Sequence, residues 1–297
     1  GRASTPSYHT RNHVLNVLVT GGSGLLGSEV VRLAAQRGWQ VTAPSHSEMD
    51  VVDLASCVRM IKSKSPDCVI HCAAFTEVDK AEADPEQAML VNRDGSANVA
   101  RAGVLAGSDI VHISTDYVFD GRATSPYGTD APVSPLGVYA TSKVAAETAV
   151  IEETLDRVSL LIVRTGWLYG GGRRDFVDKV LESGEANEDL QIVDDQRGCP
   201  TWTRNVAESV LDLIDLEMSG TMNVSDAGET TWCEFARAVL DMAGISSVVE
   251  GVSSRSFGAP AHRPSYSVLD IEETELALQR KMIPWRKALR LYMHERS

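Results

Sequence analysis

The chain has 297 residues, of which 43% are hydrophobic and 23% are charged, so it can bury a core in one large domain or two unequal ones. Its formal net charge of -13 repels polyanions, which argues against nucleic acid as the main partner. The apolar runs are too short to cross a bilayer, no signal peptide precedes them, and the five cysteines include no C-x-x-C pair. We therefore expect a cytoplasmic protein with no membrane partner, no disulfide framework and no metal site.

Short β-branched runs alternate with helical stretches from residue 14 onward, after a segment, 1–13, that lacks apolar periodicity and is expected to be a flexible tail. The predicted strands cover residues 14–20, 39–43, 67–74, 109–114 and 159–166, and the predicted helices lie at 24–37, at 54–64, after Pro85 with Asp84 as cap, and around Tyr139. Unbroken apolar strands separated by helices are typical of a parallel sheet covered on both faces. The predicted fold class is therefore α/β, with a Rossmann-type doubly wound parallel sheet.

The composition changes near residue 166, where the chain becomes rich in glycine and polar residues and its helical stretches become shorter. We interpret residues 14–166 as a dinucleotide-binding domain. Residues 167–297 are expected to form mainly a smaller α/β substrate-binding lobe, with part of this segment threaded back into the first domain.

A glycine-rich loop, TGGSGLLG, ends the first predicted strand and opens the first predicted helix. Gly21 permits a tight turn, Gly24 lets the backbone approach a pyrophosphate at the helix N-terminus, and Gly27 lets the helix pack on the strand. A glycine turn without a ligand is the alternative, and the position of the loop in the first βαβ unit favours dinucleotide binding. No lysine followed by serine or threonine closes the loop, which excludes a P-loop.

The segment YATSK places Tyr139 and Lys143 four residues apart, on one face of a helix. By spacing alone, a solvated surface contact is the more common explanation of such a pair. When a hydride reaches a carbonyl carbon, the oxygen needs a proton, and free tyrosine, with a pKa of about 10, is too weak an acid near neutral pH. A neighbouring ammonium stabilises the phenolate, so we expect Lys143 to lower the pKa of Tyr139.

Seven ordered segments resemble the extended short-chain dehydrogenase/reductase superfamily and, within it, the dTDP-4-dehydrorhamnose reductase family, over residues 14–290. They are HCAAFTEVDKAEADPEQAMLVN, HISTDYVFDG, SPLGVYATSK, RTGWLYG, VDDQRGCPT, GETTWCEFARAV and HRPSYSVLD. The chain departs from the family pattern at HCAAF, where asparagine and three alanines are more common, and at Gly166, where serine or another residue is common.

The resemblance implies NAD(P)H-dependent reduction of the 4-keto group of a dTDP-4-keto-6-deoxyhexose, with Thr115, Tyr139 and Lys143 as catalytic residues. Tyr139 is the acid, Lys143 also binds the nicotinamide ribose, and Thr115 hydrogen-bonds the carbonyl oxygen. The implied cofactor-binding residues are Gly21, Ser23, Gly24, Leu25, Leu26, Gly27, Ser45, His46, Asp53, Leu54, Ala73, Ala74, Ser114, Tyr139, Lys143 and Arg164. The implied substrate-binding residues are Thr76, Val78, Thr115, Asp116, Tyr117, Tyr139, Trp167, Gln196 and Arg263. A homodimer is compatible with this family.

Several of these roles have structural alternatives. Asp53 can cap the following helix as well as contact adenine. Trp167 can be a buried aromatic side chain, and Gln196 and Arg263 can bridge the two domains, rather than hold the nucleotide-sugar.

The end of the second predicted strand bears on the choice of cofactor. NAD-selective Rossmann sites usually carry a carboxylate there, and residues 43–47 contain none. Ser45 and His46 offer a hydroxyl and an imidazole to a 2′-phosphate, whereas the arginine typical of NADP sites is missing and Glu48 opposes the attraction. We predict NADPH as the cofactor with a modest preference, about five- to tenfold in specificity, and NADH still used.

Two other functions share this fold. Dehydratases generally place a glutamate after the aspartate of the HISTDY segment, whereas Tyr117 follows Asp116 here, so elimination lacks its base. A non-catalytic regulatory subunit similar to the β subunit of methionine adenosyltransferase remains an alternative, because an intact Thr115, Tyr139 and Lys143 do not exclude it.

Overall fold

The computed structural model describes residues 14–296, so the predicted tail lies outside the described residues. Its centre is a six-stranded sheet with the order β10-β5-β4-β3-β1-β2. The strands are β1 (Asn16–Thr20), β2 (Gln40–Thr42), β3 (Cys68–His71), β4 (Asp109–Thr115), β5 (Leu160–Thr165) and β10 (Gly220–Asn223). Every neighbouring pair runs parallel. The predicted Rossmann-type sheet is confirmed.

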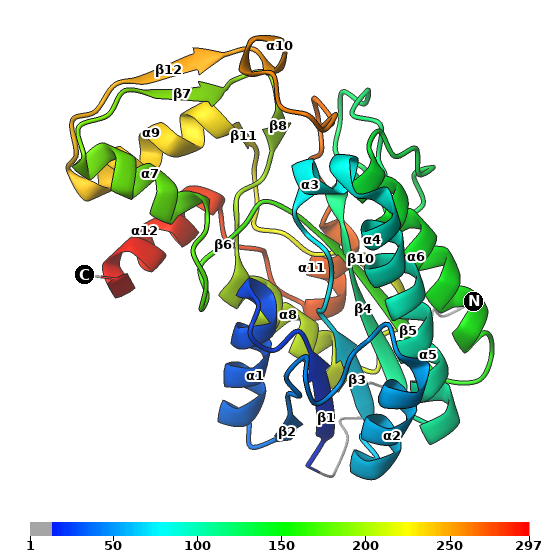
Figure 1. Ribbon diagram of the computed structural model, residues 1–297. Coiled ribbons are helices and arrows are strands. Elements are labelled where there is room, and N and C mark those ends of the chain that lie inside the picture. The colour runs from blue at the N-terminus through cyan, green and yellow to red at the C-terminus, as the bar shows by residue number, and fades with distance from the viewer. Residues whose placement is uncertain (1–13, 297) are drawn as a thin grey trace, which may run out of the picture.

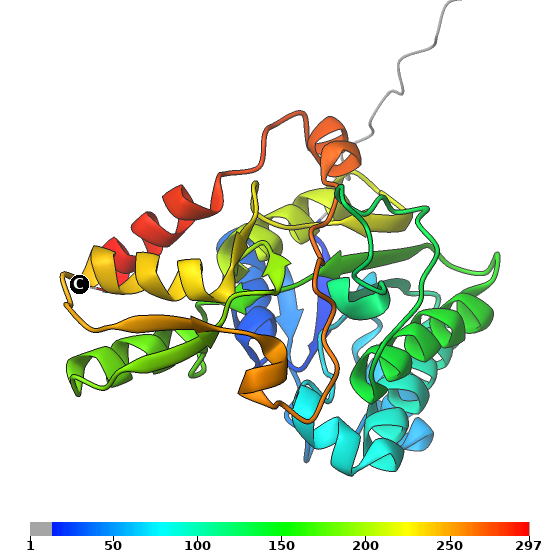
Figure 2. The same ribbon diagram turned by 90° about the horizontal axis from the view of Figure 1, so that it is seen from above.

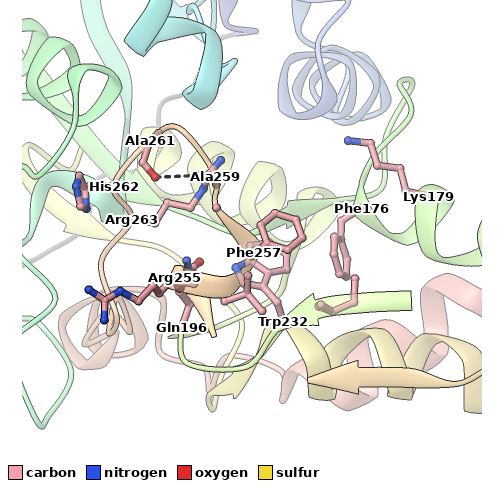
Figure 3. A pocket seen from close by; sticks show the side chains of 14 residues that line it. Phe176, Lys179, Gln196, Trp232, Arg255, Phe257, Ala259, Ala261, His262 and Arg263 are labelled. Atoms are coloured by element: carbon pink, nitrogen blue, oxygen red, sulfur yellow. Dashed lines mark hydrogen bonds between the residues drawn. The ribbon is translucent and has the colours of Figure 1, made fainter. Parts of the chain in front are cut away.

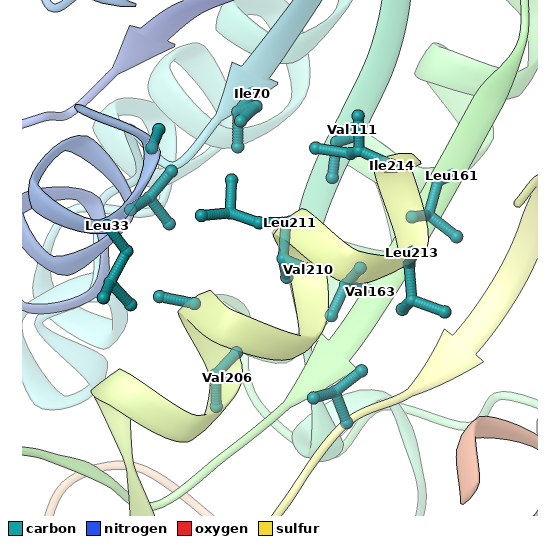
Figure 4. Packing of buried hydrophobic residues seen from close by; sticks show 14 of the residues in the cluster. Leu33, Ile70, Val111, Leu161, Val163, Val206, Val210, Leu211, Leu213 and Ile214 are labelled. Carbon is teal, nitrogen blue, oxygen red and sulfur yellow. The ribbon is translucent and has the colours of Figure 1, made fainter. Parts of the chain in front are cut away.

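Helices cover both faces of this sheet (Figure 1). One layer contains α1 (Leu25–Gln36) and α8 (Thr203–Asp215), with α11 (Glu272–Leu278) against α8. The other layer contains α2 (Leu54–Lys64), α5 (Gly95–Ala106) and α6 (Val138–Thr154). Figure 4 shows the first layer, where side chains of α8 such as Val210 and Leu211 pack toward Ile70 and Val111 of the sheet. Because water reaches neither face, the strands are continuous apolar runs rather than alternating ones.

Capping residues fix where the helices of the second layer begin. The Asp53 carboxylate accepts a hydrogen bond from Ala55 N at 2.9 Å and opens α2, which confirms its structural role. Asp84 accepts from Gln87 N at 3.1 Å and opens α4 (Pro85–Met89). The predicted long helix after Pro85 is confirmed, with one irregularity: a π-helical turn, η1 (Leu90–Asp94), joins α4 directly to α5.

The π-helical turn places Asn92 in a buried position between two functional segments. The Asn92 side chain accepts from Phe75 N at 2.7 Å, donates to Phe75 O at 3.0 Å and donates to Ser142 Oγ at 2.8 Å. Phe75 follows β3 and Ser142 belongs to α6. The turn therefore ties the end of β3 to the helix that carries Tyr139 and Lys143, in line with the frequent occurrence of π-bulges at functional sites.

A smaller region lies beside the main sheet (Figures 1 and 2). Its elements are β6 (Leu168–Tyr169), α7 (Phe176–Glu185), β7 (Leu190–Val193), β8 (Arg197–Gly198), β9 (Thr201–Trp202), β11 (Thr230–Thr231), α9 (Trp232–Ala243), β12 (Val249–Val252), α10 (Ser254–Phe257) and α12 (Trp285–Arg296). A separate core holds it together, in which α9 packs against α7 and α12 and which is rich in aromatic side chains. Between β9 and β11 the chain returns to the main sheet and forms α8 and β10.

Two short helices lie near the junction of the two regions, α3 (Val78–Ala83) and the 3-10 turn η2 (Asp116–Val118). Across residues 14–296, no helix is both long enough and apolar enough to cross a lipid bilayer.

Candidate active site

The glycine-rich loop between β1 and α1 is packed so tightly that side chains are excluded. A Cβ at Gly27 would lie 2.1 Å from Gly21 O, and a Cβ at Gly21, whose φ is +66°, would lie 2.7 Å from Ala73 N. Gly24, the first residue before α1, provides no side-chain cap, and the first turn contains no acidic residue. The helix N-terminus therefore presents unpaired N–H groups to an anion, and the loop fits the pyrophosphate of a dinucleotide.

The other residues predicted to hold the cofactor surround this loop at the carboxyl ends of the strands. Ser23 is exposed in the loop, Leu25 and Leu26 begin α1, and Ala73 and Ala74 follow β3. Ser45 and His46 lie in an exposed turn after β2, where Ala43 Cβ is only 2.8 Å from the position of a Cβ at Gly22. Asp53 and Leu54 begin α2, and the Asp53 carboxylate is exposed on its outer side. Their contacts with a cofactor stay predictions.

The loop after β6 closes against the same helix terminus. A Cβ at Gly171, whose φ is +110°, would lie 2.4 Å from Leu25 O, and Gly172 N donates to Ser28 Oγ at 3.3 Å. This loop was not predicted to belong to the site, although its run of three glycines is the signal for a close backbone approach.

Thr115, Tyr139 and Lys143 come from the end of β4 and the first turns of α6. Thr115 Oγ1 accepts from Tyr117 N at 3.2 Å and donates to Asp116 Oδ1 at 3.1 Å, so the η2 turn holds its side chain. Lys143 is 3% exposed, and its ammonium donates to Ile113 O at 2.7 Å and lies 3.5 Å from His112 Nε2. The structure thus brings the three predicted catalytic residues to one edge of the sheet.

Burial dominates the proton affinities at this edge. Removal from water raises the pKa of Tyr139 to about 12, and a hydrogen bond with the Thr115 side chain offsets only part of this change. In the chain by itself burial therefore determines the pKa of Tyr139, and the expected lowering by Lys143 stays a prediction. Burial lowers the pKa of Lys143 to about 8, although the charge of Glu147 opposes the change. Tyr139 accordingly stays protonated near neutral pH, as a proton donor must.

Asp116 lies behind Thr115 and is buried. Burial raises its pKa to about 7, against hydrogen bonds from Ser267 and Thr115. A Cβ at Gly166 would lie 2.2 Å from Asp116 Oδ1, so the glycine at this position, one of the two departures from the family pattern, makes room for the carboxylate.

Arg164 was predicted to bind the cofactor, and the structure shows it inside a buried ion pair. Its guanidinium donates to both carboxylate oxygens of Glu147, at 3.0 Å and 2.8 Å. Ser114, another predicted cofactor residue, donates to Glu147 Oε1 at 2.5 Å. Glu147 on α6 therefore connects β4 and β5 behind the catalytic residues, a role that the sequence analysis did not assign.

A cavity of about 630 Å³ opens in the smaller region, and Gln196 and Arg263 of the predicted substrate residues line it (Figure 3). Phe176, Trp232 and Phe257 supply aromatic surface, whereas Lys179, Arg255 and Arg263 supply positive charge. This combination suits a ligand with a flat ring and anionic groups.

Arg263 connects the cavity to the catalytic edge. Asp79 of α3 holds its guanidinium with two hydrogen bonds, at 3.0 Å and 2.8 Å, and the Arg263 side chain lies near enough to Tyr117 for the two groups to interact electrostatically. The Tyr117 ring meets the ring of Tyr139 edge-on, with centroids 6.3 Å apart. A series of side-chain neighbours therefore runs from the cavity through Arg263 and Tyr117 to Tyr139. The predicted residues Thr76 and Val78 precede Asp79 in the sequence.

Trp167 lies beneath the cavity. Its ring stacks on Trp232 with centroids 3.6 Å apart, and a Cβ at Gly198 would lie 2.3 Å from it. Its φ of 51° is in the left-handed region, which costs a bulky residue free energy. Within residues 14–296 its buried Nε1 has no hydrogen-bond partner.

Several residues of the site escaped prediction because their roles depend on distant contacts. Asp79 and Arg263 are 184 residues apart in the sequence, and nothing in the TEVDKAE segment identifies the partner of this aspartate. Phe176 and Trp232 were not predicted, because only the tertiary structure exposes them to a common cavity. Within residues 14–296, no cluster of three or more His, Cys, Asp or Glu is arranged to hold a metal ion.

Comparisons with known proteins agree with this geometry. Residues 15–297 match the family model described as RmlD substrate binding domain. The chain is 38% identical over 281 residues to the spore coat polysaccharide biosynthesis protein SpsK of Bacillus subtilis. The aligned segment covers 95% of this chain and 98% of SpsK. It is 39% identical over 279 residues to a dTDP-4-dehydrorhamnose reductase of Streptomyces griseus, covering 92% of this chain and 91% of the relative.

A solved structure extends the agreement to the whole fold. The dTDP-4-dehydrorhamnose reductase of Bacillus anthracis str. Ames, solved in complex with NADP, superposes with a TM-score of 0.91 at 32% identity and covers 95% of this chain and 100% of that one. With both regions of the chain matched, the chain belongs to the dTDP-4-dehydrorhamnose reductase (RmlD) family of the extended short-chain dehydrogenase/reductase superfamily.

Proposed function

We propose that this chain reduces the 4-keto group of a dTDP-4-keto-6-deoxyhexose, with NADPH as the preferred cofactor. Relatives at this level of identity carry the reductase name, and one of them is solved with NADP, which supports an enzyme over the regulatory-subunit alternative. The observation that carries the proposal is the path from the charged aromatic cavity through Arg263 and Tyr117 to Tyr139.

Each part of the path has a physical role. The nucleotide lies in the cavity, where aromatic side chains contact the base, and Lys179, Arg255 and Arg263 face the diphosphate. The sugar then extends past Tyr117 to the catalytic edge.

At the catalytic edge Tyr139 gives its proton to the carbonyl oxygen, and the Thr115 hydroxyl turns from Asp116 to donate a hydrogen bond to the same oxygen. NADPH, held at the N-terminus of α1, supplies the hydride. Lys143 is fixed by Ile113 O and contributes a positive charge that stabilises the phenolate left on Tyr139. The raised pKa of Tyr139 keeps the acid loaded before the reaction.

The test is the rate of NADPH oxidation with a dTDP-4-keto-L-sugar, for the wild type and for Tyr139→Phe. Loss of a general acid lowers the rate by about 10²- to 10⁴-fold. Calorimetric titration with dTDP checks that the variant still binds the nucleotide with wild-type affinity. Equal oxidation rates would remove Tyr139 from the mechanism. A homodimer and a cytoplasmic location stay predictions from the sequence.

A further inference from the structure

The turn after β2 contains a carboxylate that is held by its own neighbours. Ser45 N and Ser45 Oγ both donate to Glu48 Oε2, each at 2.8 Å, while Glu48 N donates back to Ser45 O at 3.1 Å. The two hydrogen bonds from Ser45 lower the pKa of Glu48, with a smaller contribution from the charge of Lys64 on α2, so the group is an anion at neutral pH. Ser45 Oγ also lies 3.1 Å from Ser47 Oγ.

This turn lies where a Rossmann sheet distinguishes its cofactors. It follows the second strand at the carboxyl edge, and Ala43 at its start touches the glycine-rich loop. In such sites, a carboxylate at the end of the second strand accepts hydrogen bonds from the adenosine ribose and repels a 2′-phosphate. The sequence places no carboxylate at residues 43–47, but the fold brings that of Glu48 back onto Ser45.

We propose that Glu48 is a specificity-determining residue that limits the preference of this chain for the phosphorylated cofactor. Its carboxylate occupies the amide and hydroxyl of Ser45, the donors that would otherwise meet the 2′-phosphate, and adds a negative charge beside them. His46, the remaining cationic candidate in the turn, has its Nε2 3.7 Å from Asp50 Oδ1, so a second carboxylate offsets its charge. Of the other charged groups nearby, Lys64 lies on α2, and Arg59 lies 3.9 Å from Asp53.

The inference rests on the proposed function only for the identity of the cofactors. Glu48→Gln keeps an oxygen acceptor for Ser45 and removes the charge, and Glu48→Ala removes both. We expect each variant to raise the ratio of kcat/KM for NADPH to kcat/KM for NADH by about tenfold, through a lower KM for NADPH. Glu48 is exposed and belongs to neither of the hydrophobic clusters that cover the two faces of the main sheet, so neither substitution is expected to disturb folding.

Glu188→Gln is the matched control, since it removes the same charge from an exposed position in the smaller region. Its ratio is expected to equal that of the wild type. Wild-type ratios in both Glu48 variants would overturn the inference, as would an equal rise in Glu188→Gln.

Binding separates this inference from the proposed function. The dissociation constants of NADP⁺ and NAD⁺, measured by calorimetry without any sugar, are expected to shift in the same direction in the Glu48 variants. If the dissociation constants shift but no sugar is reduced, the proposed function is refuted and the role of Glu48 is supported. If the sugar is reduced but the dissociation constants do not shift, the role of Glu48 is refuted and the proposed function is supported.

Discussion

The buried ion pair between Arg164 and Glu147 offers a quantitative test of how the catalytic helix is attached to the sheet. Both side chains are 7% exposed, and Arg164 also donates to Thr129 O at 3.1 Å and covers the Phe119 ring at 5.3 Å. In Arg164→Met, the Glu147 carboxylate stays buried and loses two of the hydrogen bonds that satisfy it. Removing one partner of a buried pair costs about 3–5 kcal/mol, so we expect a loss of that size in the free energy of unfolding.

The assay is urea unfolding followed by circular dichroism, for the wild type, Arg164→Met, Glu147→Leu and the double variant. The double variant leaves no unpaired buried charge, so its loss is expected to be smaller than the sum of the two single losses by about 2 kcal/mol or more.

Additive losses, or a loss below about 1 kcal/mol in Arg164→Met, would refute the structural role of the pair. The same variants test the prediction that Arg164 binds the cofactor. A weaker affinity for NADP⁺ with unchanged stability would support that role, and the structure leads us to expect the opposite.

Three further predictions concern the site. The pKa of Lys143 is about 8, and the reaction needs its charged form. The value of kcat/KM for reduction should therefore be constant below pH 8 and fall as the pH rises through this value. A kcat/KM that rises with pH in this range would contradict the role of the Lys143 ammonium. Asp79→Asn removes the carboxylate that orients Arg263. In steady-state kinetics the KM for the nucleotide-sugar should rise about tenfold, while the KM for NADPH stays unchanged. An equal rise in both KM values would indicate a general loss of structure instead. Gly27→Ala places a Cβ 2.1 Å from Gly21 O and should weaken NADP⁺ binding, measured by calorimetry, at least about tenfold. The control is Gly172→Ala, whose Cβ would lie 3.5 Å from Ser28 Oγ and which should bind NADP⁺ with wild-type affinity. Equal affinities in the two variants would refute the tight packing of the glycine-rich loop.

Local sequence signals predicted most of the main sheet. The apolar runs and the glycine-rich loop identified the strands and the first crossover, since a doubly covered parallel strand needs an unbroken apolar run. The caps Asp53 and Asp84 were readable because capping depends on a side chain and an amide two or three residues away. The π-helical turn was not readable, because Asn92 is held by Phe75 and Ser142, both distant in sequence.

In the candidate site, too, features set by the local sequence were predicted, and features set by the tertiary structure were not. Motifs identified Tyr139 and Lys143, because their spacing is a property of one helix. The rise in the pKa of Tyr139 was not predicted, because the sequence shows the neighbouring charge but not the extent of burial. Glu48 was identified as a nearby charge, but its hydrogen bonds to Ser45 depend on the conformation of the turn.

Product analysis of the wild-type enzyme tests the central claim most directly. The protein is incubated with NADPH and a dTDP-4-keto-6-deoxyhexose, and the sugar is followed by NMR while the absorbance of NADPH is recorded. We predict that each equivalent of NADPH consumed converts one 4-keto group to a carbinol at the same carbon, with the nucleotide and the 6-deoxy carbon unchanged. An unreduced keto-sugar with NADPH intact, under conditions where dTDP binding is measurable, would contradict the account.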